Sequence, residues 1–483
     1  MTSMFMIAIE ATIVSTAMPQ IVADLGGLRL YSWVFSSFLL AQTAMTVVFG
    51  NLADVYGRKP MMLAGIAIFL AGSVLAGFAW SMPAMIVFRL IQGVGAGAMQ
   101  PVAMTIVADL YPARERGKVQ GYLASVWAIS AIVGPVVGGL IIRNVSWAWI
   151  FWINIPVALA AAVGFLAFLH EDARHERRPI DIAGAASFTI AVTSLLIALT
   201  ELGAASTAEL GAAGGLFCAA AVVFVIQERR ASHPMVSFAL WSHRPIAAVN
   251  GVGLLAGMTL TGLTTFLPIY VQIVLHRSPV VAGFALTTML IGWPAGATLA
   301  ARLFHRHSLR SLLLTGAALL PAGAAFFVAL TPGSSPLTAA LGSLIMGFGM
   351  GLLAVSSLVL VQEIVDRTER GSVTASNLFS RNLGSTLGAT VLGAVLNHGL
   401  SRSLGAASVT SDQLRHLLDA GPGMVGSDAA ISVALQRALN LTFWGMLVMA
   451  FATVLIAILV PPVAISHAPE GPAQQPAHMD SME

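Results

Sequence analysis

The chain has 483 residues, of which 57% are hydrophobic and only 9% are charged, and its mean hydropathy is +0.86. An ordinary soluble domain carries about 25% charged residues, so a chain this long and this apolar cannot hide its hydrophobic side chains in a soluble core. The formal charge of +3 comes from 24 basic and 21 acidic residues, and this balance gives no reason to expect a nucleic-acid partner. The sequence predicts an all-α, multi-pass membrane protein.

Fourteen segments meet the requirement of about 20 mostly apolar residues for a helix that spans a bilayer. They cover residues 4–22, 31–50, 61–79, 84–108, 118–142, 147–169, 182–200, 210–227, 245–274, 280–301, 310–330, 335–362, 372–397 and 436–460. The first segment is not preceded by the basic region of a signal peptide. We therefore expect a retained spanning helix there, one that is either short or continued by residues upstream.

The number of basic residues differs between even-numbered and odd-numbered connecting loops, and this difference tests the count of fourteen helices. The even-numbered loops carry sixteen of them and the odd-numbered loops carry five. The sixteen are Arg58, Lys59, Arg114, Arg116, Lys118, Arg174, Arg177, Arg178, Arg229, Arg230, Arg244, Arg302, Arg306, Arg310, Arg367 and Arg370, and the five are Arg29, Arg143, Arg277, Arg402 and Arg415. Because basic residues flank the cytoplasmic ends of spanning helices, we expect the even-numbered loops and both termini to lie in the cytoplasm.

Two strings of the chain return 254 residues later: "RLIQGVGAGAM" at 89–99 as "SLIMGFGMGLL" at 343–353, and "VADLYPARERG" at 107–117 as "VQEIVDRTERG" at 361–371. That offset holds about eight helices of spanning length with their loops, two more than a six-helix repeat. We therefore expect a six-helix half over 1–181, two inserted helices over 182–230, a second six-helix half over 231–460 and a disordered cytoplasmic tail over 461–483. Repeated halves place a transporter's substrate site at their interface.

The first predicted helix, "MIAIEATIVSTAMP", carries the carboxylate of Glu10 near its middle. A charge at the bilayer centre costs roughly 2.5–3.5 kcal/mol on insertion scales, and Glu10 is the one acidic residue that we place deep in the membrane. An apolar site favours the neutral form of a carboxyl, and a nearby arginine favours the charged form. We hypothesise that Glu10 takes up a proton from outside and releases it inside. The alternative is a structural hydrogen bond to a neighbouring helix.

The loop after the second predicted helix reads "GNLADVYGRKP". Gly50 and Gly57 allow a tight turn and a close approach of helices, and Asp54 and Arg58 place charge at the membrane face. This combination of residues favours a specific structural role for the loop, and the alternative is an ordinary solvated turn.

The fourth predicted helix contains "FRLIQGVGAGAMQP". Arg89, Gln92 and Gln100 fall on one face at helical spacing, and a guanidinium inside a spanning helix must face a partner or a water-filled cavity. The alternative is that Arg89 reaches the membrane surface from near a helix end. The fifth helix contains "SAIVGPVVGGLI", where Pro135 removes one intrahelical hydrogen bond beside the small residues Gly134, Gly138 and Gly139.

These strings resemble the motifs of the major facilitator superfamily. The loop string is similar to its loop motif, "RLIQGVGAG" to its helix-four motif, and "GPVVGG" to the helix-five motif associated with antiporters. The opening "IEATIVSTAMP", with "SWAWIFWINIP" at 146–156 and "LPIYVQ" at 267–272, resembles the fourteen-helix drug:proton antiporters of the EmrB/QacA type. That branch usually has Asp where this chain has Glu10.

The resemblance implies roles for individual residues. Glu10 and Arg89 would couple transport to protons at a shared central cavity, and Asp54 would engage the N-terminus of helix eleven. Conformational gating would involve Gly50, Asp54, Gly57, Arg58, Asp109, Arg116, Gly134, Pro135, Gly138 and Gly139. The substrate cavity would use Gln42, Gln92, Gln100, Trp127, Thr261, Thr264 and Thr265.

The implied function is proton-coupled export of lipophilic or cationic small molecules, such as drugs, antiseptics and dyes, across the bacterial inner membrane, a route to antibiotic resistance. The alternative is a dedicated exporter of a single natural product or metabolite. A channel would need continuous polar pore lining and an enzyme would need a catalytic cluster, and we find neither in the sequence. We expect no cofactor and no metal, since the proton gradient is the driving force, and the sequence leaves open whether a periplasmic adaptor takes part.

Overall fold

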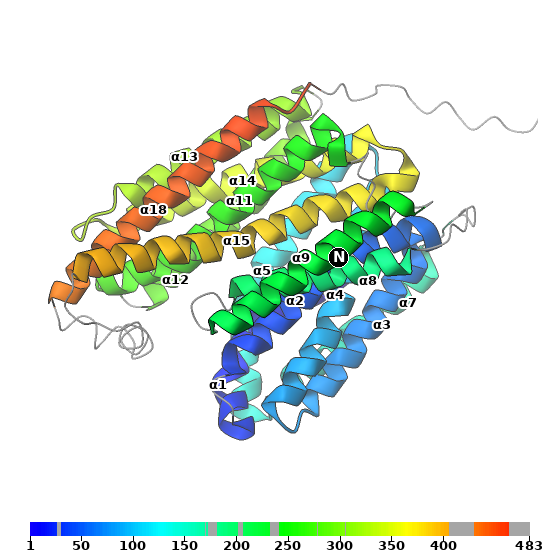
Figure 1. Ribbon diagram of the computed structural model, residues 1–483, viewed down its shortest axis with the longest axis horizontal. Helices are drawn as coiled ribbons and strands as arrows, with labels where there is room; N and C mark the ends of the chain where they lie inside the picture. The colour runs from blue at the N-terminus through cyan, green and yellow to red at the C-terminus, as the bar shows by residue number, and fades with distance from the viewer. Residues whose placement is uncertain are drawn as a thin grey trace, which may run out of the picture.

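The computed structural model describes residues 1–26, 30–169, 171, 181–200, 206–231, 241–277, 279–304, 306–404 and 429–462. The predicted tail is therefore outside the described residues from 463 onward. All regular elements in the described residues are helices (Figure 1). Their bounds are α1 Thr2–Leu25, α2 Tyr31–Tyr56, α3 Arg58–Gly77, α4 Met82–Leu110, α5 Ala113–Asn144, α6 Trp149–Trp152, α7 Asn154–Phe168, α8 Ile182–Thr200, α9 Thr207–Arg230, α11 Arg244–Ile269 continued by the π-helix η2 Tyr270–Val274, α12 Pro279–Leu303, α13 Leu309–Val328, α14 Pro336–Ile364, the 3-10 helix η3 Arg367–Glu369, α15 Arg370–Leu404 and α18 Ala429–Ile458.

Helices α1 to α7 pack among themselves, as do α11 to α18, and the two groups lie side by side in Figure 1. The largest hydrophobic core is formed entirely by residues between Ile246 and Val460. Two smaller cores belong to the first group. The groups meet where α2 packs against α15 and where α5 packs against α12.

The pair α8 and α9 lies outside these two groups, with α8 resting on α2 and α15. Phe188 of α8 stacks near Phe379 of α15, with ring centroids 5.5 Å apart. Together with residues of α2 they form a small separate core. The pair therefore covers one of the two seams at which the groups meet.

Eleven helices of the described residues are long and apolar enough to cross a membrane. Three further long helices, α1, α5 and α15, fall outside that set. The polar composition of α15 has a structural cause, because Asn377, Arg381, Asn382, Ser385 and Thr386 on this helix line an internal cavity.

Glycines allow α3 and α4 to pack backbone against backbone. A Cβ added at Gly95 of α4 would overlap the backbone of Phe69 and would lie 2.6 Å from the carbonyl oxygen of Gly65. The same holds for Gly72 of α3, which faces the backbone of Gln92. Small residues at helix contacts let backbones approach closely in membranes, where apolar burial between helices gives little driving force.

This packing predicts that Gly95→Ala lowers the melting temperature of the detergent-solubilised protein. Overpacking against backbone costs about 1–3 kcal/mol, because neither helix can yield by moving a side chain. Gly164→Ala in α7 is the control, since a Cβ there would meet nothing within 4 Å. Equal melting temperatures for the two variants would contradict the packing argument.

Candidate functional site

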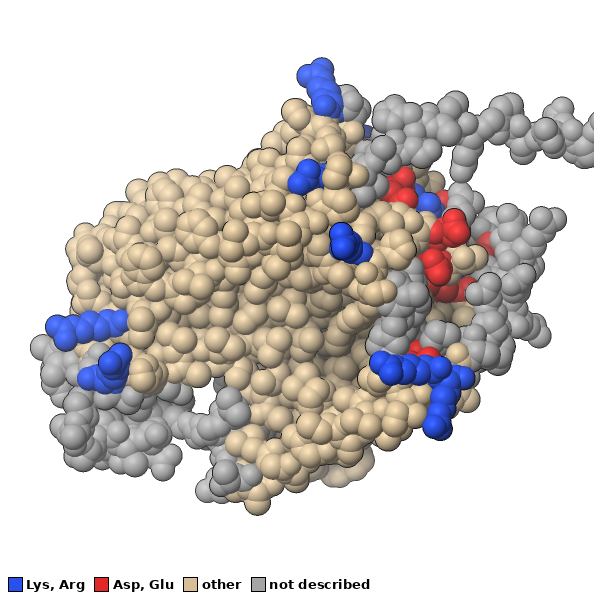
Figure 2. Space-filling view, turned by 45° about the horizontal axis from the view of Figure 1, so that its top comes forward, with Lys and Arg blue, Asp and Glu red and all other residues tan. Residues whose placement is uncertain are grey.

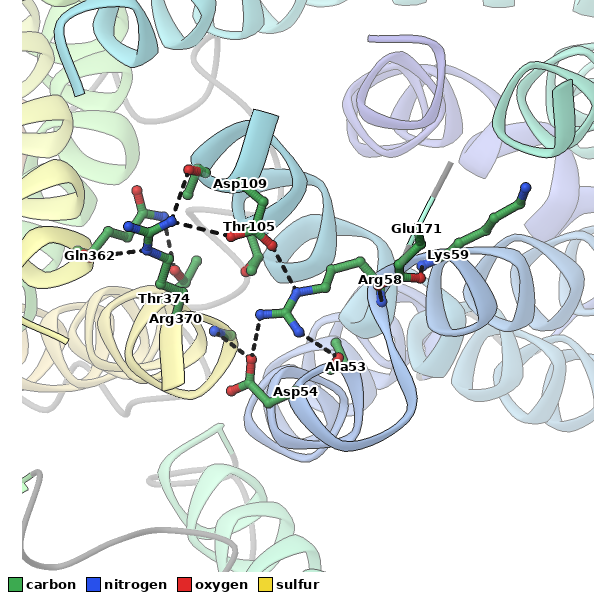
Figure 3. Close-up of polar contacts among 12 residues, drawn as sticks. Ala53, Asp54, Arg58, Lys59, Thr105, Asp109, Glu171, Gln362, Arg370 and Thr374 are labelled. Carbon is green, nitrogen blue, oxygen red and sulfur yellow. Dashed lines mark hydrogen bonds and ion pairs between the residues drawn. The ribbon is translucent and has the colours of Figure 1, made fainter. Parts of the chain in front are cut away.

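Asp54, near the end of α2, joins the two helix groups at the start of α15 (Figure 3). Its carboxylate accepts hydrogen bonds from the backbone N–H of Gly371 at 2.9 Å and of Ser372 at 2.7 Å, and from the Ser372 hydroxyl at 2.8 Å. The first N–H groups of a helix lack intrahelical partners and carry its positive dipole end. A carboxylate there satisfies those donors and is attracted by the dipole.

Arg58 holds that carboxylate in place from the other side. Its guanidinium donates to Asp54 Oδ1 at 3.0 Å and to the Ala53 carbonyl oxygen at 3.1 Å, and it pairs with Asp109 of α4 at 3.0 Å. Asp109 also pairs with Arg370 of α15 at 3.4 Å. The charges of α2, α4 and α15 therefore form one connected network.

The helices meet at this point because both carry glycine. A Cβ at Gly50 of α2 would overlap Ala375, and one at Gly371 would lie 2.5 Å from both Asp54 Oδ1 and the Gly50 carbonyl oxygen. Gly57 then ends α2 with φ +99, a conformation that L side chains rarely adopt. These two steric requirements explain the glycines of the loop string.

A second ion pair joins the groups at the same end of the bundle. Arg116 of α5 pairs with Glu363 of α14 at 2.5 Å, and its guanidinium also donates to the Tyr111 carbonyl oxygen at 2.8 Å. We call the contacts of Asp54, Arg58, Asp109, Arg116, Glu363, Arg370 and Ser372 the latch. Figure 2 shows acidic side chains gathered at one end of the molecule, beside a broad uncharged surface. The described conformation is closed at this end.

Glu10 of α1 lies in a second polar cluster, enclosed by α1, α3, α4 and α7 of the first helix group. The guanidinium of Arg89 donates to Glu10 Oε1 at 2.5 Å and to Gln92 Oε1 at 2.6 Å, and the Asn154 amide donates to Glu10 Oε2 at 2.8 Å. Ser73 accepts from both Gln92 and Asn154, at 3.2 and 2.9 Å. We call these five residues the Glu10 cluster.

The Glu10 cluster is closed to solvent and internally paired. Glu10 is 0% exposed and Arg89 is 2% exposed. Arg89 also donates to the Val34 carbonyl oxygen at 3.2 Å and lies 4.3 Å from the centre of the Phe38 ring. A buried charge of either sign is tolerated only when it is paired in this way, and removal of one partner costs about 3–5 kcal/mol.

Helix α5 approaches α1 through the glycine of the helix-five string. A Cβ at Gly134 would overlap the hydroxyl of Thr12, which itself donates to the Ser130 carbonyl oxygen at 3.0 Å. Gly138 is buried, whereas a Cβ at Gly139 would meet nothing within 4 Å. Of the small residues beside Pro135, Gly134 therefore lies at a helix contact and Gly139 does not. Pro135 lies inside α5.

A cavity of about 450 Å³ lies between the two helix groups. Its lining comes from α2, α4 and α5 on one side and from α11, α12, α14 and α15 on the other. Gln42, Gln100 and Trp127 are among the lining residues, as the sequence-based set expected. Gln42 and Gln100 also contact each other, with Nε2 of Gln42 3.3 Å from Oε1 of Gln100.

The rest of the predicted cavity set lies elsewhere. Gln92 belongs to the Glu10 cluster, because its turn of α4 faces α3. The Thr261 hydroxyl donates to the Ser385 carbonyl oxygen at 2.9 Å, and Thr264 and Thr265 are exposed. None of these three threonines lines the cavity, although Leu260 of the same helix does.

Glu10 and Arg89 also lie away from the cavity, which no residue of the Glu10 cluster lines. The pairing of the two residues was expected, but their placement at the shared cavity was wrong. Both face inward within the first helix group, so the acid and the cavity are separate features of the molecule.

The family model of the Major Facilitator Superfamily matches residues 1–389. The chain belongs to this superfamily. It is 34% identical over 433 residues to the multidrug transporter protein MdtP of Bacillus subtilis, which covers 89% of this chain and 79% of that protein. It is 35% identical over 437 residues to multidrug resistance protein 3 of the same organism, covering 89% and 82%. The human organic anion transporter MFSD10 superposes with a TM-score of 0.64 at 15% identity, over 94% of this chain and 97% of that chain.

The superfamily resemblance predicted several residues of the latch, but it assigned Asp54 to the wrong partner helix. Asp54 engages the start of α15, whereas the eleventh predicted segment, 310–330, corresponds to α13. The prediction was wrong because it kept the count of a twelve-helix transporter, and the helices α8 and α9 shift that count by two.

Sequence reasoning missed two other residues. The Glu171 carboxylate, beyond the end of α7, accepts from the backbone N–H groups of Arg58 at 2.6 Å and Lys59 at 2.9 Å and so caps α3. No local pattern connects residues this far apart. Arg381 lines the cavity, and the rule that singled out Arg89, an arginine within a spanning segment, would have found it.

The latch predicts that Asp54→Asn opens this end of the bundle. Loss of charge-assisted hydrogen bonds, worth about 1.5–3 kcal/mol together with the ion pair, shifts the equilibrium roughly tenfold or more. Spin labels at the exposed positions Tyr56 and Thr368, in a Cys218→Ser background, should report a longer distance in the variant. Glu115→Gln, an exposed acid of α5, should leave the distance distribution unchanged. A distribution that Asp54→Asn does not move would contradict the latch.

Proposed function

We propose that this protein exports lipophilic or cationic small molecules across the inner membrane in exchange for protons. The observation that carries the proposal is the cavity of about 450 Å³ between two helix groups that are held together at one end by the latch. The family and the names of the two Bacillus relatives point to transport rather than catalysis and support multidrug efflux as the class.

We further propose that all fourteen predicted segments cross the membrane, including α1, α5 and α15, as in the EmrB/QacA type. The halves would be 1–181 and 231–460, with 182–230 as the inserted pair. The latch would face the cytoplasm together with both termini, because the even-numbered loops carry most of the basic residues. The protein would need no cofactor.

Transport in this scheme alternates between two closures. The described conformation is closed at the latch, so substrate would enter from the cytoplasm only after Asp54 leaves the start of α15 and Arg116 leaves Glu363. Export would then end with the latch closed again. The latch residues would set the balance between the two conformations and need not touch substrate.

Proton coupling would act through the Glu10 cluster and at a distance from the cavity. A proton on Glu10 removes the charge that Arg89 pairs with, so the neutral acid changes the contacts that hold α1 against α4 and α7. Because Glu10 is enclosed in the described conformation, the proton would enter when these helices separate. Coupling would therefore be conformational and would not involve competition for one site.

The test is proton-driven dye transport in membrane vesicles. We expect Glu10→Gln to lose uphill export by at least about tenfold, since one protonation step worth about 2.3 kcal/mol per 100 mV is removed, and to retain exchange of dye down its gradient. Glu10→Asp, which keeps the carboxyl, should retain part of the uphill export.

Glu115→Gln, an exposed carboxylate at the start of α5, is the matched control and should transport normally. Full uphill export by Glu10→Gln would show that Glu10 does not couple, and an inactive Glu10→Asp beside an active Glu10→Gln would rule out protonation as its role. Transport of a single compound among a panel of unrelated dyes and drugs would favour the dedicated exporter instead.

A further inference from the structure

The lining of the central cavity contains a single charged side chain among the described residues, and it is the guanidinium of Arg381. Arg381 lies on α15, about three turns from the latch end of that helix. The remaining polar lining residues are amides and hydroxyls. They are Gln42, Thr43, Gln100, Gln120, Asn377, Asn382, Ser385 and Thr386.

Within the described residues, the Arg381 guanidinium has neither an ion pair nor a hydrogen bond, whereas other arginines in or near the bundle have carboxylate partners. Arg89 pairs with Glu10, Arg58 with Asp54 and Arg116 with Glu363. An unpaired guanidinium inside an apolar bundle is costly, because burial of a charge without a partner removes its hydration without replacing it. The partner of Arg381 must therefore come from the contents of the cavity.

A second lining residue also offers a donor without an acceptor. Gln120 of α5 is 6% exposed, and its Nε2 atom has no hydrogen-bond partner in the described part of the chain. Both unsatisfied groups are thus donors, one on each side of the junction between the helix groups. A ligand that suits them brings acceptor atoms.

The rest of the lining is aromatic and aliphatic. Trp127 of α5 and Trp293 of α12 lie in the lining together with Met104, Leu260 and Leu358. Binding sites of this kind use apolar walls for the body of a ligand and a few polar groups to fix its orientation. Here the orienting group is a cation.

We propose that the transported substrates are lipophilic organic anions, and that Arg381 binds their carboxylate, sulfonate or phenolate group. This inference rests on the proposed export function and narrows its substrate class away from cations. A guanidinium binds an oxyanion through two parallel hydrogen bonds. A cationic substrate would meet an unpaired positive charge, and none of the lining residues that the structure describes is acidic.

The test compares two dyes that share a xanthene ring system, the anion fluorescein and the cation rhodamine 6G. Equilibrium binding to the purified full-length protein in detergent is measured for the wild type, Arg381→Gln and Arg381→Lys. We expect the wild type to prefer fluorescein. Arg381→Gln should weaken fluorescein binding about tenfold or more, as for loss of a charged hydrogen-bond partner, and should not weaken rhodamine 6G binding.

Arg381→Lys keeps the charge and should retain part of the affinity for fluorescein. Arg402→Gln removes an exposed arginine from the same helix and should change neither affinity. A wild type that prefers rhodamine 6G would overturn the proposal. So would an Arg381→Gln variant with unchanged fluorescein affinity, or one in which both dyes lose affinity equally.

Vesicle transport of the same two dyes separates this inference from the export function. Fluorescein binding that depends on Arg381 without proton-driven export would leave the anion site standing and refute the proposed export. Proton-driven export of rhodamine 6G alone, insensitive to Arg381→Gln, would leave export standing and refute the anion site.

Discussion

Every charge inside this apolar bundle needs a partner, and that requirement organises the polar features of the structure. The cost of an unpaired charge in a low-dielectric interior is several kilocalories per mole. Glu10 and Arg89 meet the requirement within one helix group, and the latch meets it across two groups. The first arrangement fastens helices within one helix group, and the second fastens two groups that we propose come apart.

The latch combines charge with small residues, and each depends on the other. Asp54 reaches the backbone of Gly371 only because Gly50 lets α2 and α15 touch. The hydrogen bonds of the carboxylate in turn hold the two helices in contact, since glycine alone supplies no directional bond. A joint of this kind is closed by short hydrogen bonds and can be released by a small displacement, because such bonds weaken steeply with distance and angle.

Hydropathy alone predicts the helices well, because apolar stretches of spanning length have few other uses. It does not predict how each helix is turned about its axis, since side chains that face lipid and side chains that face the core are both apolar. For that reason Thr261, Thr264 and Thr265 were assigned to a cavity that Leu260 lines, and Gln92 to a cavity that Gln100 lines. Asp54, Arg58, Asp109 and Arg116 were expected together, and they lie at one end of the bundle, where charged side chains can reach one another; their partners Glu363, Arg370 and Ser372 were not predicted. The cap that Glu171 provides for α3 depends on contacts between distant segments, which no local pattern records.

Arg381, the one cationic side chain among the described residues of the cavity lining, has a further consequence for energetics. When a site opens first to one compartment and then to the other, the electric potential at that site changes even if the charge itself stays still. An empty carrier with Arg381 exposed to the cavity would carry one positive charge through that change, and a carrier occupied by a monovalent anion would carry none. A membrane potential that is negative inside, worth about 2.3 kcal/mol per charge and 100 mV, would then act on the empty return toward the cytoplasm and leave the occupied outward step untouched. The membrane potential would therefore drive the return of the empty carrier, and the outward movement of the bound anion would require no electrical work.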